Sequence, residues 1–237
     1  MTESGSKSDK LDVIASRSTL LLLVRHAQTI DNLEQRLSGW TDGNLTPYGE
    51  QQIIRLGDHF NRAHSDVEAI YSSPLTRARK TAEAISHHTG HSLRFEDDLR
   101  EMYFGEMDGR PFEELRTAYS HLLAADEDVE LEDFMWPSGE SRSGFTARVV
   151  ETVNRIARTH VGGSVAMVTH GGVIATFLTH MHRESTALWR KWVVPNASLT
   201  EIAWDPVDQR GLVIRRGDDL HLSELKAEEA ARSTPIL

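Results

Sequence analysis

The sequence of 237 residues contains no cysteine. This absence excludes a disulfide framework, a thiol nucleophile and a cysteine-based metal site, so the fold must depend on its hydrophobic core. Long apolar runs are also missing, because no stretch approaches the roughly 20 residues that a membrane-spanning helix needs. Residues 1–10 lack the apolar segment of a signal peptide. The sequence therefore predicts a cytoplasmic protein with no membrane partner.

Positive charge is scarce as well. The chain has 26 Lys and Arg residues against 36 Asp and Glu residues, which gives a formal net charge of -10. Nucleic acids are bound by basic surfaces, so no nucleic acid is expected as a partner. An anionic small molecule would have to be attracted by a local group of cations.

The middle of the chain has no linker rich in Pro, Gly or Ser. At this length a single α/β domain accounts for the chain, and we expect it at residues 18–226. The composition at the two ends predicts a disordered N-terminal tail at 1–17 and a flexible C-terminal tail at 227–237. The oligomeric state stays open, and a homodimer is one of the alternatives.

The most informative stretch is an uninterrupted apolar run at 20–24 that ends abruptly in Arg25 and His26. Such a run, followed by turn signals, is typical of a strand buried on both faces of a parallel sheet. Two further apolar runs, 69–71 and 165–169, also end in polar residues. The residues that follow these two runs include Arg77, His170 and Gly171. Ligands bind at the carboxyl ends of parallel strands, so two imidazoles and two guanidinium groups there predict an anion site with a nitrogen nucleophile.

Helix signals surround these strands. Thr46 and Pro47 suit an N-cap and a first helical position, which predicts a helix to about Arg62. Ser73 and Pro74 repeat the signal and place Arg77 in a first turn, whose positive end strengthens an anion site. Further helices are expected at 112–123, 144–160 and 172–181, and further strands at 199–204 and 211–215.

The ordered set of segments resembles the histidine phosphatase superfamily, the phosphoglycerate-mutase-like fold. The signature of that family is Arg-His-Gly near the N-terminus and a distant second His-Gly. The matching segments are 25–29 with Asn32, 39–42, 45–49, 72–78, 99–101, 137–141 and 169–172. One departure is Ala27, where the family usually has Gly. The resemblance implies a three-layer α/β/α fold with a mostly parallel central sheet and helices on both faces.

The resemblance also implies roles for the polar residues at the strand ends. His26 is the expected nucleophile, which attacks phosphorus and becomes a phosphohistidine. Arg25 and Arg77 are expected to clamp the phosphate oxygens with their planar forks. His170 is expected to be a further donor to the phosphoryl group, in its cationic form.

Other positions of the family pattern complete the expected site. Glu101 matches the residue that protonates the leaving oxygen, and its pKa should be raised near a phosphate dianion. Asn32 adds a neutral donor, and Gly171 follows the second histidine. Thr29 and Gly39 either line the phosphate pocket or pack the loop that carries them. No metal and no other cofactor is required by this chemistry.

Three functions remain open at this stage. The favoured one is a phosphomonoesterase, of the histidine acid phosphatase type, that hydrolyses a small phosphorylated metabolite through a phosphohistidine. Gly172 and Val173 resemble the branch that includes α-ribazole and broad-specificity phosphatases, and the segment after Glu101 lacks the adjacent Arg pair of mutases. The alternatives are a cofactor-dependent phosphoglycerate mutase and a regulatory phosphate-binding protein without turnover.

The charges after Glu101 lead to an expectation about the substrate. The segment carries four acidic residues and then an acidic run at 126–133, and Arg110 and Arg116 are the compensation nearby. The four acidic residues are Glu106, Asp108, Glu113 and Glu114. A cover of this kind would disfavour a polyanion, so the sequence predicts monophosphates with neutral or apolar leaving groups.

Overall fold

A central sheet of six strands organises the structure, a computed structural model that describes residues 17–118 and 134–233. The strands are β1 (Thr19–Arg25), β2 (Ala69–Ser72), β3 (Leu93–Phe95), β4 (Ser164–Thr169), β5 (Leu199–Asp205) and β6 (Arg210–Asp218). Their order across the sheet is β3-β2-β4-β1-β5-β6. The first four of these strands run parallel, and β5 and β6 are antiparallel to their neighbours. The prediction of a mostly parallel sheet is confirmed.

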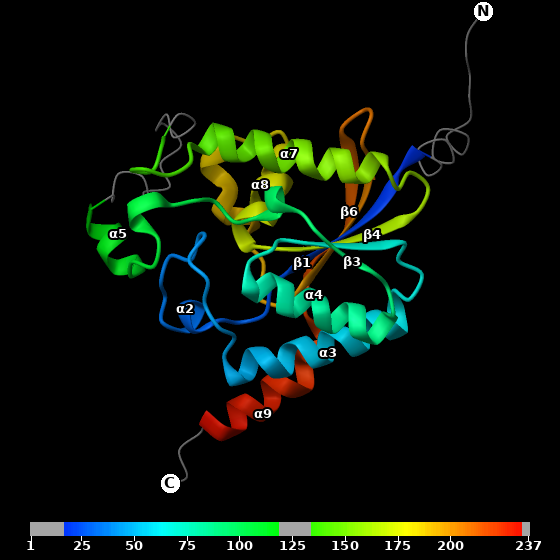
Figure 1. Cartoon of the computed structure of the whole chain (residues 1–237), viewed down its shortest axis with the longest axis horizontal. Coiled ribbons are helices and arrows are strands. Elements are labelled where there is room, and N and C mark those ends of the chain that lie inside the picture. Colours follow the sequence, from blue (N-terminus) through cyan, green and yellow to red (C-terminus); the bar gives the residue numbers. More distant parts are fainter. Residues whose placement is uncertain (1–16, 119–133, 234–237) are drawn as a thin grey trace, which may run out of the picture.

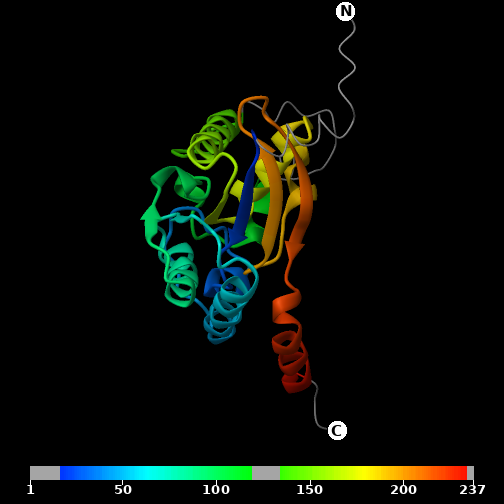
Figure 2. The same cartoon turned by 90° about the vertical axis from the view of Figure 1, so that its right-hand side faces the viewer.

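Helices cover both faces of this sheet (Figures 1 and 2). The α-helices are α2 (Ile30–Leu33), α3 (Pro47–Ala63), α4 (Thr76–Thr89), α5 (Phe112–Ala118), α7 (Arg142–Arg158), α8 (Gly171–Met181) and α9 (Ser223–Ser233). Short 3-10 helices are η1 (Asp97–Leu99), η2 (Gly105–Met107), η4 (Thr186–Trp192) and η5 (Leu220–Leu222). Within the described ranges, none of these helices combines the length and the apolar character needed to cross a membrane.

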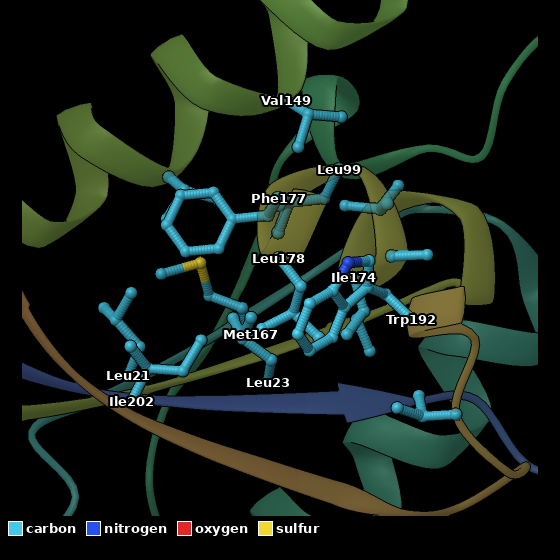
Figure 3. Close-up of a cluster of buried hydrophobic side chains, with 14 of the residues drawn as sticks. Leu21, Leu23, Leu99, Val149, Met167, Ile174, Phe177, Leu178, Trp192 and Ile202 are labelled. Carbon is cyan, nitrogen blue, oxygen red and sulfur yellow. The ribbon is translucent and has the colours of Figure 1, made fainter. Parts of the chain in front are cut away.

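The alternation of side chains along β1 explains the three layers. Leu21 and Leu23 point to one face, where they pack in a cluster with residues of α7 and α8 (Figure 3). Leu22 and Val24 point to the other face and pack with residues of α3 and α4. Because successive side chains of a strand point to opposite faces, an unbroken apolar run needs helices on both sides. The three-layer α/β/α prediction is therefore confirmed.

The register of the parallel strands brings their carboxyl ends together. Arg25 at the end of β1 pairs with Thr169 at the end of β4, and Ser72 at the end of β2 pairs with Val168. His26, Ser73 and His170 come directly after these three strands. The expectation that polar residues from three distant segments meet at one edge of the sheet is confirmed.

The helix starts agree with the sequence in one case and differ in another. Thr46 caps α3 by accepting from the Gly49 N–H over 2.9 Å, and the helix ends at Ala63, close to the predicted Arg62. Helix α4, by contrast, begins at Thr76 rather than at Ser73 and Pro74. Its first N–H is capped from a distant loop, because Asp42 accepts from the Thr76 N–H over 2.8 Å. Arg77 still lies in the first turn, as predicted.

The other boundaries shift by a few residues. Helix α7 begins two residues earlier than predicted, since Ser141 is its N-cap and accepts from the Gly144 N–H over 3.0 Å. Helices α5 and α8 and strands β5 and β6 occur where they are expected, although residues 119–123 of the predicted α5 segment lie outside the described residues. The short edge strand β3 has no counterpart in the sequence-based prediction.

The C-terminal tail prediction is wrong for residues 227–233, which belong to helix α9. Two leucines explain why: Leu222 and Leu225 are buried in the cluster with α3 and α4. They anchor the first turn, and the Ala, Glu and Lys residues that follow favour a helix. Residues 1–16 and 234–237 of the two expected tails lie outside the described part of the chain.

Candidate active site

His26 follows β1 and is almost fully buried. Its backbone N–H donates to the carbonyl oxygen of Thr169 over 2.9 Å. Its Nδ1 lies 2.8 Å from the carbonyl oxygen of Ala27, and because a carbonyl only accepts, Nδ1 carries the proton and Nε2 keeps a free lone pair. Burial, and then the charges of Arg77 and Arg25, lower the pKa of His26 well below its usual value. The ring is therefore neutral, as a nitrogen nucleophile must be.

Two arginines, Arg25 partly buried and Arg77 fully buried, flank His26 and donate to carbonyl oxygens. Arg25 Nη1 donates to the Val194 carbonyl over 2.6 Å. Arg77 is fully buried and donates over 2.6–3.2 Å to the carbonyl oxygens of Ser38, Gly39 and Thr41. Burial lowers the pKa of both guanidinium groups, and Glu101 opposes this effect. Arginine nevertheless stays charged in proteins, so both side chains bring positive charge into the interior.

His170 lies beside His26, with ring centroids 5.2 Å apart. Its Nε2 is 2.8 Å from the Ser73 hydroxyl oxygen. Burial is the main reason that the pKa of His170 lies well below its usual value, and the charges of Arg77 and Arg25 lower it further. The expectation of a cationic His170 is therefore wrong for the free site, because a buried imidazole next to two guanidinium groups cannot easily take up a proton.

When the Ser73 hydroxyl donates to His170 Nε2, the proton of the neutral ring lies on Nδ1. Three buried nitrogen donors at this place then have no partner among the described residues. They are Nε of Arg25, Nε of Arg77 and Nδ1 of His170. An unpaired buried donor costs free energy of about 1–3 kcal/mol, so three of them in one place need a ligand rich in acceptor oxygens. A tetrahedral oxyanion such as phosphate has this property.

Glu101, the expected acid of the site, is buried. Its Oε1 accepts from the Met102 N–H over 2.9 Å, and its Oε2 accepts from the Gly172 N–H over 2.8 Å. Burial raises the pKa of the Glu101 carboxyl, although these two hydrogen bonds and the charges of Arg77 and Arg25 oppose the rise. A Cβ at position 172 would lie 2.2 Å from Glu101 Oε1, so the carboxyl occupies space that only a glycine leaves open.

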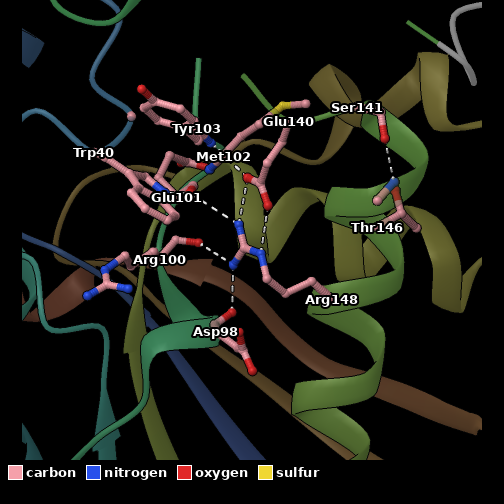
Figure 4. A network of polar contacts seen from close by, with 12 residues as sticks. Trp40, Asp98, Arg100, Glu101, Met102, Tyr103, Glu140, Ser141, Thr146 and Arg148 are labelled. Atoms are coloured by element: carbon pink, nitrogen blue, oxygen red, sulfur yellow. Dashed lines mark hydrogen bonds and ion pairs between the residues drawn. The ribbon is translucent and has the colours of Figure 1, made fainter. Parts of the chain in front are cut away.

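A network of charged hydrogen bonds holds the Glu101 segment (Figure 4). Arg148 Nε and Nη2 donate to the two carboxylate oxygens of Glu140 over 2.9 and 2.8 Å. The same guanidinium donates to the carbonyl oxygens of Asp98, Arg100 and Glu101. Glu140 also accepts from the Tyr103 N–H over 2.8 Å. The backbone of residues 98–103 is thus held by two side chains, Arg148 of α7 and Glu140.

Asn32, Thr29 and Asn196 form a supporting group. Asn196 Nδ2 donates to the carbonyl oxygen of His26 and to Asn32 Oδ1, both over 3.0 Å. Asn32 Oδ1 also accepts from the Thr29 N–H, which leaves Asn32 Nδ2 as the donor that faces the cavity lined by Asn32. Thr29 is fully buried and caps α2. Of the two roles left open for Thr29, the structure therefore shows the packing role.

Gly39 positions Arg77 rather than lining the cavity. Its carbonyl oxygen accepts from Arg77, and its N–H donates to Asp108 Oδ1 over 2.7 Å. Asp108 also accepts from the N–H groups of Trp40 and Thr41. A Cβ at position 39 would lie 2.4 Å from Asp108 Oδ1. Gly171, in contrast, lines the cavity next to the Arg25 guanidinium.

The cavity above His26 has a volume of about 310 Å³. Its lining includes Arg25, His26, Asn32 and Glu101 from the predicted site. The remaining lining residues are Arg36, Leu37, Ser38, Met102, Phe104, Phe112, Arg142, Phe145, Gly171, Gly172, Thr176, Trp189, Arg190 and Val193. The wall is therefore aromatic and cationic, and the described residues show no group of three or more His, Cys, Asp or Glu side chains arranged to hold a metal.

For the described residues, this wall corrects the expectation of an acidic cover. Arg110 and Arg116, named as the nearby compensation, do not line the cavity, whereas Arg36, Arg142 and Arg190 do. The four acidic residues have partners elsewhere: Glu106 accepts from Ser138, Asp108 from three backbone N–H groups, and Glu113 and Glu114 pair with Arg116 and Arg110. The acidic run at 126–133 lies outside the described residues.

A sequence model of the histidine phosphatase superfamily (branch 1) matches residues 21–216. The chain belongs to this superfamily. Within the superfamily, the "Uncharacterized phosphatase PhoE" of Bacillus subtilis is 30% identical over 184 residues, which cover 78% of this chain and 88% of that protein. The metal-independent phosphoserine phosphatase of Arabidopsis thaliana is 29% identical and covers 90% and 87% of the two chains.

Solved structures of the superfamily agree with the fold. The mycobacterial glucosyl-3-phosphoglycerate phosphatase superimposes with a TM-score of 0.74 at 27% identity, over 86% of this chain and all of that one. These named relatives are phosphatases, which supports a phosphatase of this superfamily.

The backbone at position 27 accommodates Ala27, where the family usually has Gly, because Ala27 does not have a positive φ. Its N–H donates to Thr81 Oγ1, and its carbonyl oxygen accepts from His26 Nδ1.

Several residues of this superfamily member escaped the sequence-based prediction. Ser73, Asn196 and Asp108 act on the site through hydrogen bonds to His170, Asn32 and Gly39. Ser73 lies in segment 72–78, which matches the family pattern, so that segment carried a signal for it. The lining residues Arg142, Trp189 and Arg190 carry no local signal, since they come from helices α7 and η4, which are about 45 positions apart in the chain.

Proposed function

We propose that this histidine phosphatase superfamily member is a phosphomonoesterase that works through a phosphohistidine at His26. The observation that carries the proposal is a neutral His26 with a free Nε2 next to three unpartnered buried donors. The donors suit the oxygens of a phosphoryl group, and the free nitrogen suits its phosphorus. The phosphatase names of the relatives support the same reaction class.

The first half of the reaction forms the covalent intermediate. His26 Nε2 attacks phosphorus, the bond between phosphorus and the alcohol oxygen breaks, and Glu101 gives its proton to that oxygen. Arg25, Arg77 and His170 stabilise the charge on the three equatorial oxygens, where such donors contribute most in the transition state. Burial favours the protonated carboxyl of Glu101, which is the form that this step needs.

The second half returns the enzyme to its starting state. The Glu101 carboxylate takes a proton from a water molecule, and the water oxygen attacks phosphorus. The bond between phosphorus and His26 Nε2 breaks, and inorganic phosphate leaves. The proton stays on Nδ1 and is donated to the Ala27 carbonyl oxygen throughout, so the ring keeps one tautomer through the cycle.

The experiment that tests this proposal is acid-sensitive trapping. With a phosphorus-labelled aryl phosphate, rapid quenching should give a phosphoenzyme that is labile in acid and stable in base. The His26→Ala variant should give none, while His87→Ala, an exposed histidine on α4, should behave as the wild type. An acid-stable phosphoester would place the nucleophile elsewhere.

The same assay separates the alternatives. Transfer of the phosphoryl group between phosphoglycerates with little release of inorganic phosphate would indicate the mutase. Binding of inorganic phosphate without any turnover of phosphoesters would indicate the regulatory protein. Either result would overturn the hydrolase proposal.

A further inference from the structure

We propose that Arg142, Trp189 and Arg190 form a second anion-binding subsite, which selects phosphomonoesters whose alcohol part carries another anionic group. We call these three residues the arginine–tryptophan wall. The inference rests on the proposed phosphatase function and names its substrate class. It replaces the sequence-based expectation of a neutral or apolar leaving group.

The geometry of the wall is that of a stacked pair of cations. The Arg142 guanidinium carbon lies 5.2 Å from the Trp189 ring centroid, and that of Arg190 lies 5.6 Å from it. Stacking on an aromatic face holds a guanidinium in place while its in-plane donors stay available. All three residues line the same cavity as His26, Arg25 and Glu101. A molecule with its phosphoryl group at His26 therefore extends its other end toward the wall.

The charge of Arg142 is not neutralised by the protein. Among the described residues, Arg142 forms no ion pair, whereas Arg148 and Arg155 on the same helix pair with Glu140 and Glu96 over 2.8 Å. Burial lowers the pKa of Arg142 to about 10, and the charge of Arg190 contributes to the decrease. The effect of Arg190 on Arg142 shows that the two guanidinium groups are close, so an anion that binds at Arg142 is attracted by both charges.

The chemistry of the expected group follows from these donors. A guanidinium fork binds a carboxylate or a phosphate through two parallel hydrogen bonds, and a neutral hydroxyl offers no charge to either arginine. The phenyl rings of Phe104, Phe112 and Phe145 in the same cavity give apolar contact to the carbon skeleton between the two anions. The preferred substrate is thus a short phosphorylated hydroxy or amino acid, or a small bisphosphate.

The test compares substrates that differ in one group only. Glycerol 3-phosphate and 3-phosphoglycerate differ by a hydroxymethyl group in place of a carboxylate, and glycerol 1,3-bisphosphate offers a phosphate instead. We expect the wild type to favour the carboxylate substrate over glycerol 3-phosphate by about 10- to 100-fold in kcat/KM, since hydrogen bonds between charged groups are of that strength. The bisphosphate shows which of the two anions the wall prefers.

Variants identify the residue that causes the preference. Arg142→Gln should reduce the preference to within about threefold, mainly through KM, and urea unfolding of the variant measures whether it is folded. Trp189→Leu should have the same effect by releasing both guanidinium groups. Arg155→Gln removes an equal charge from α7 outside the cavity and should leave the preference unchanged.

The outcomes distinguish this inference from the proposed function. Hydrolysis of p-nitrophenyl phosphate with no preference among the three natural phosphates would overturn the subsite and leave the phosphatase intact. The same is true if Arg142→Gln slows all three substrates equally. If no phosphoester at all is hydrolysed and no phosphoenzyme is trapped, the proposed function fails first.

Discussion

Arg77 and Arg148 are both held inside the fold, and the protein treats their charges in opposite ways. Arg148 makes a two-pronged pair with Glu140, so its charge is neutralised within the scaffold. Arg77 donates only to carbonyl oxygens, and its Nε has no partner among the described residues. The chain as a whole is acidic, with a formal net charge of -10, so its net charge does not reveal the functional site. The comparison shows that the site is marked instead by buried positive charge that no carboxylate pairs with.

The difference has an energetic meaning. A paired buried arginine stabilises the segment that it contacts, and breaking the pair leaves a carboxylate without its cation. An unpaired buried arginine destabilises the free protein, and that cost is offset only when an anion binds. Substitution of Arg77 should therefore affect activity more than stability, and substitution of Arg148 should affect stability more than activity.

The largest effect should come from Arg77. Arg77→Met should lower kcat/KM for every phosphomonoester by about 10²–10³-fold, the usual loss when a donor to transition-state charge is removed. The free energy of unfolding should fall less than in Arg148→Met, because the loss of the hydrogen bonds to the carbonyl oxygens of Ser38, Gly39 and Thr41 is partly offset by the removal of a buried cation without a carboxylate partner. Steady-state kinetics and urea unfolding measure the two quantities. If Arg77→Met lowered the free energy of unfolding strongly and kept its activity, Arg77 would belong to the scaffold rather than to the functional site.

Glu101 contacts both regions, and its removal should depend on the substrate. Glu101→Gln should slow alkyl phosphates about 10²-fold and p-nitrophenyl phosphate only a few-fold, because a nitrophenolate needs no proton to leave. Both carboxyl oxygens accept from N–H groups, so the amide also disturbs the backbone of Met102 and Gly172. That disturbance would affect both substrates equally, and equal losses would remove Glu101 from the acid role.

Arg148 tests the scaffold side. Arg148→Met should lower the free energy of unfolding by about 2–3 kcal/mol, since Glu140 and several carbonyl oxygens lose charged hydrogen bonds, and should reduce kcat only a few-fold. Arg155→Met is the matched control on the same helix: its pair with Glu96 is half-exposed, so the expected loss is about 0–1 kcal/mol. Similar losses in both variants would show that the Arg148–Glu140 pair contributes no more to the free energy of unfolding than the half-exposed Arg155–Glu96 pair.

The smallest effect is a change in the pH profile. His26 must be neutral and Glu101 protonated, and at their usual pKa values, 6.5 and 4.5, these forms hardly coexist. The lowered pKa of His26 moves the acid limb of kcat/KM to lower pH, and the raised pKa of Glu101 moves the alkaline limb to higher pH. The two shifts thus create a common range. In Glu101→Gln the alkaline limb should disappear; a profile identical to the wild type would assign that limb to another group.

Much of the inner site could be predicted from sequence because it is encoded locally. Arg25, His26 and His170 stand at or directly after the ends of apolar strands. Arg77 lies in the first turn of the helix that follows β2, and parallel strands end on the same side of a sheet. The charge state of His170 could not be predicted in this way, since it depends on burial and on guanidinium groups from other segments. The cap of α4 was missed for a related reason: it comes from Asp42, in a loop far from Thr76 in the chain.

The sequence by itself determined the mostly parallel three-layer fold and the placement of Arg25, His26, Arg77 and His170, because strand patterning and short motifs act over a few neighbouring residues. The tertiary structure decided which charges are paired, which donors stay without partners, and that Arg142 and Arg190 meet on the ring of Trp189. Those features depend on distances between helices that no local pattern specifies. They are the features from which the substrate preference is inferred.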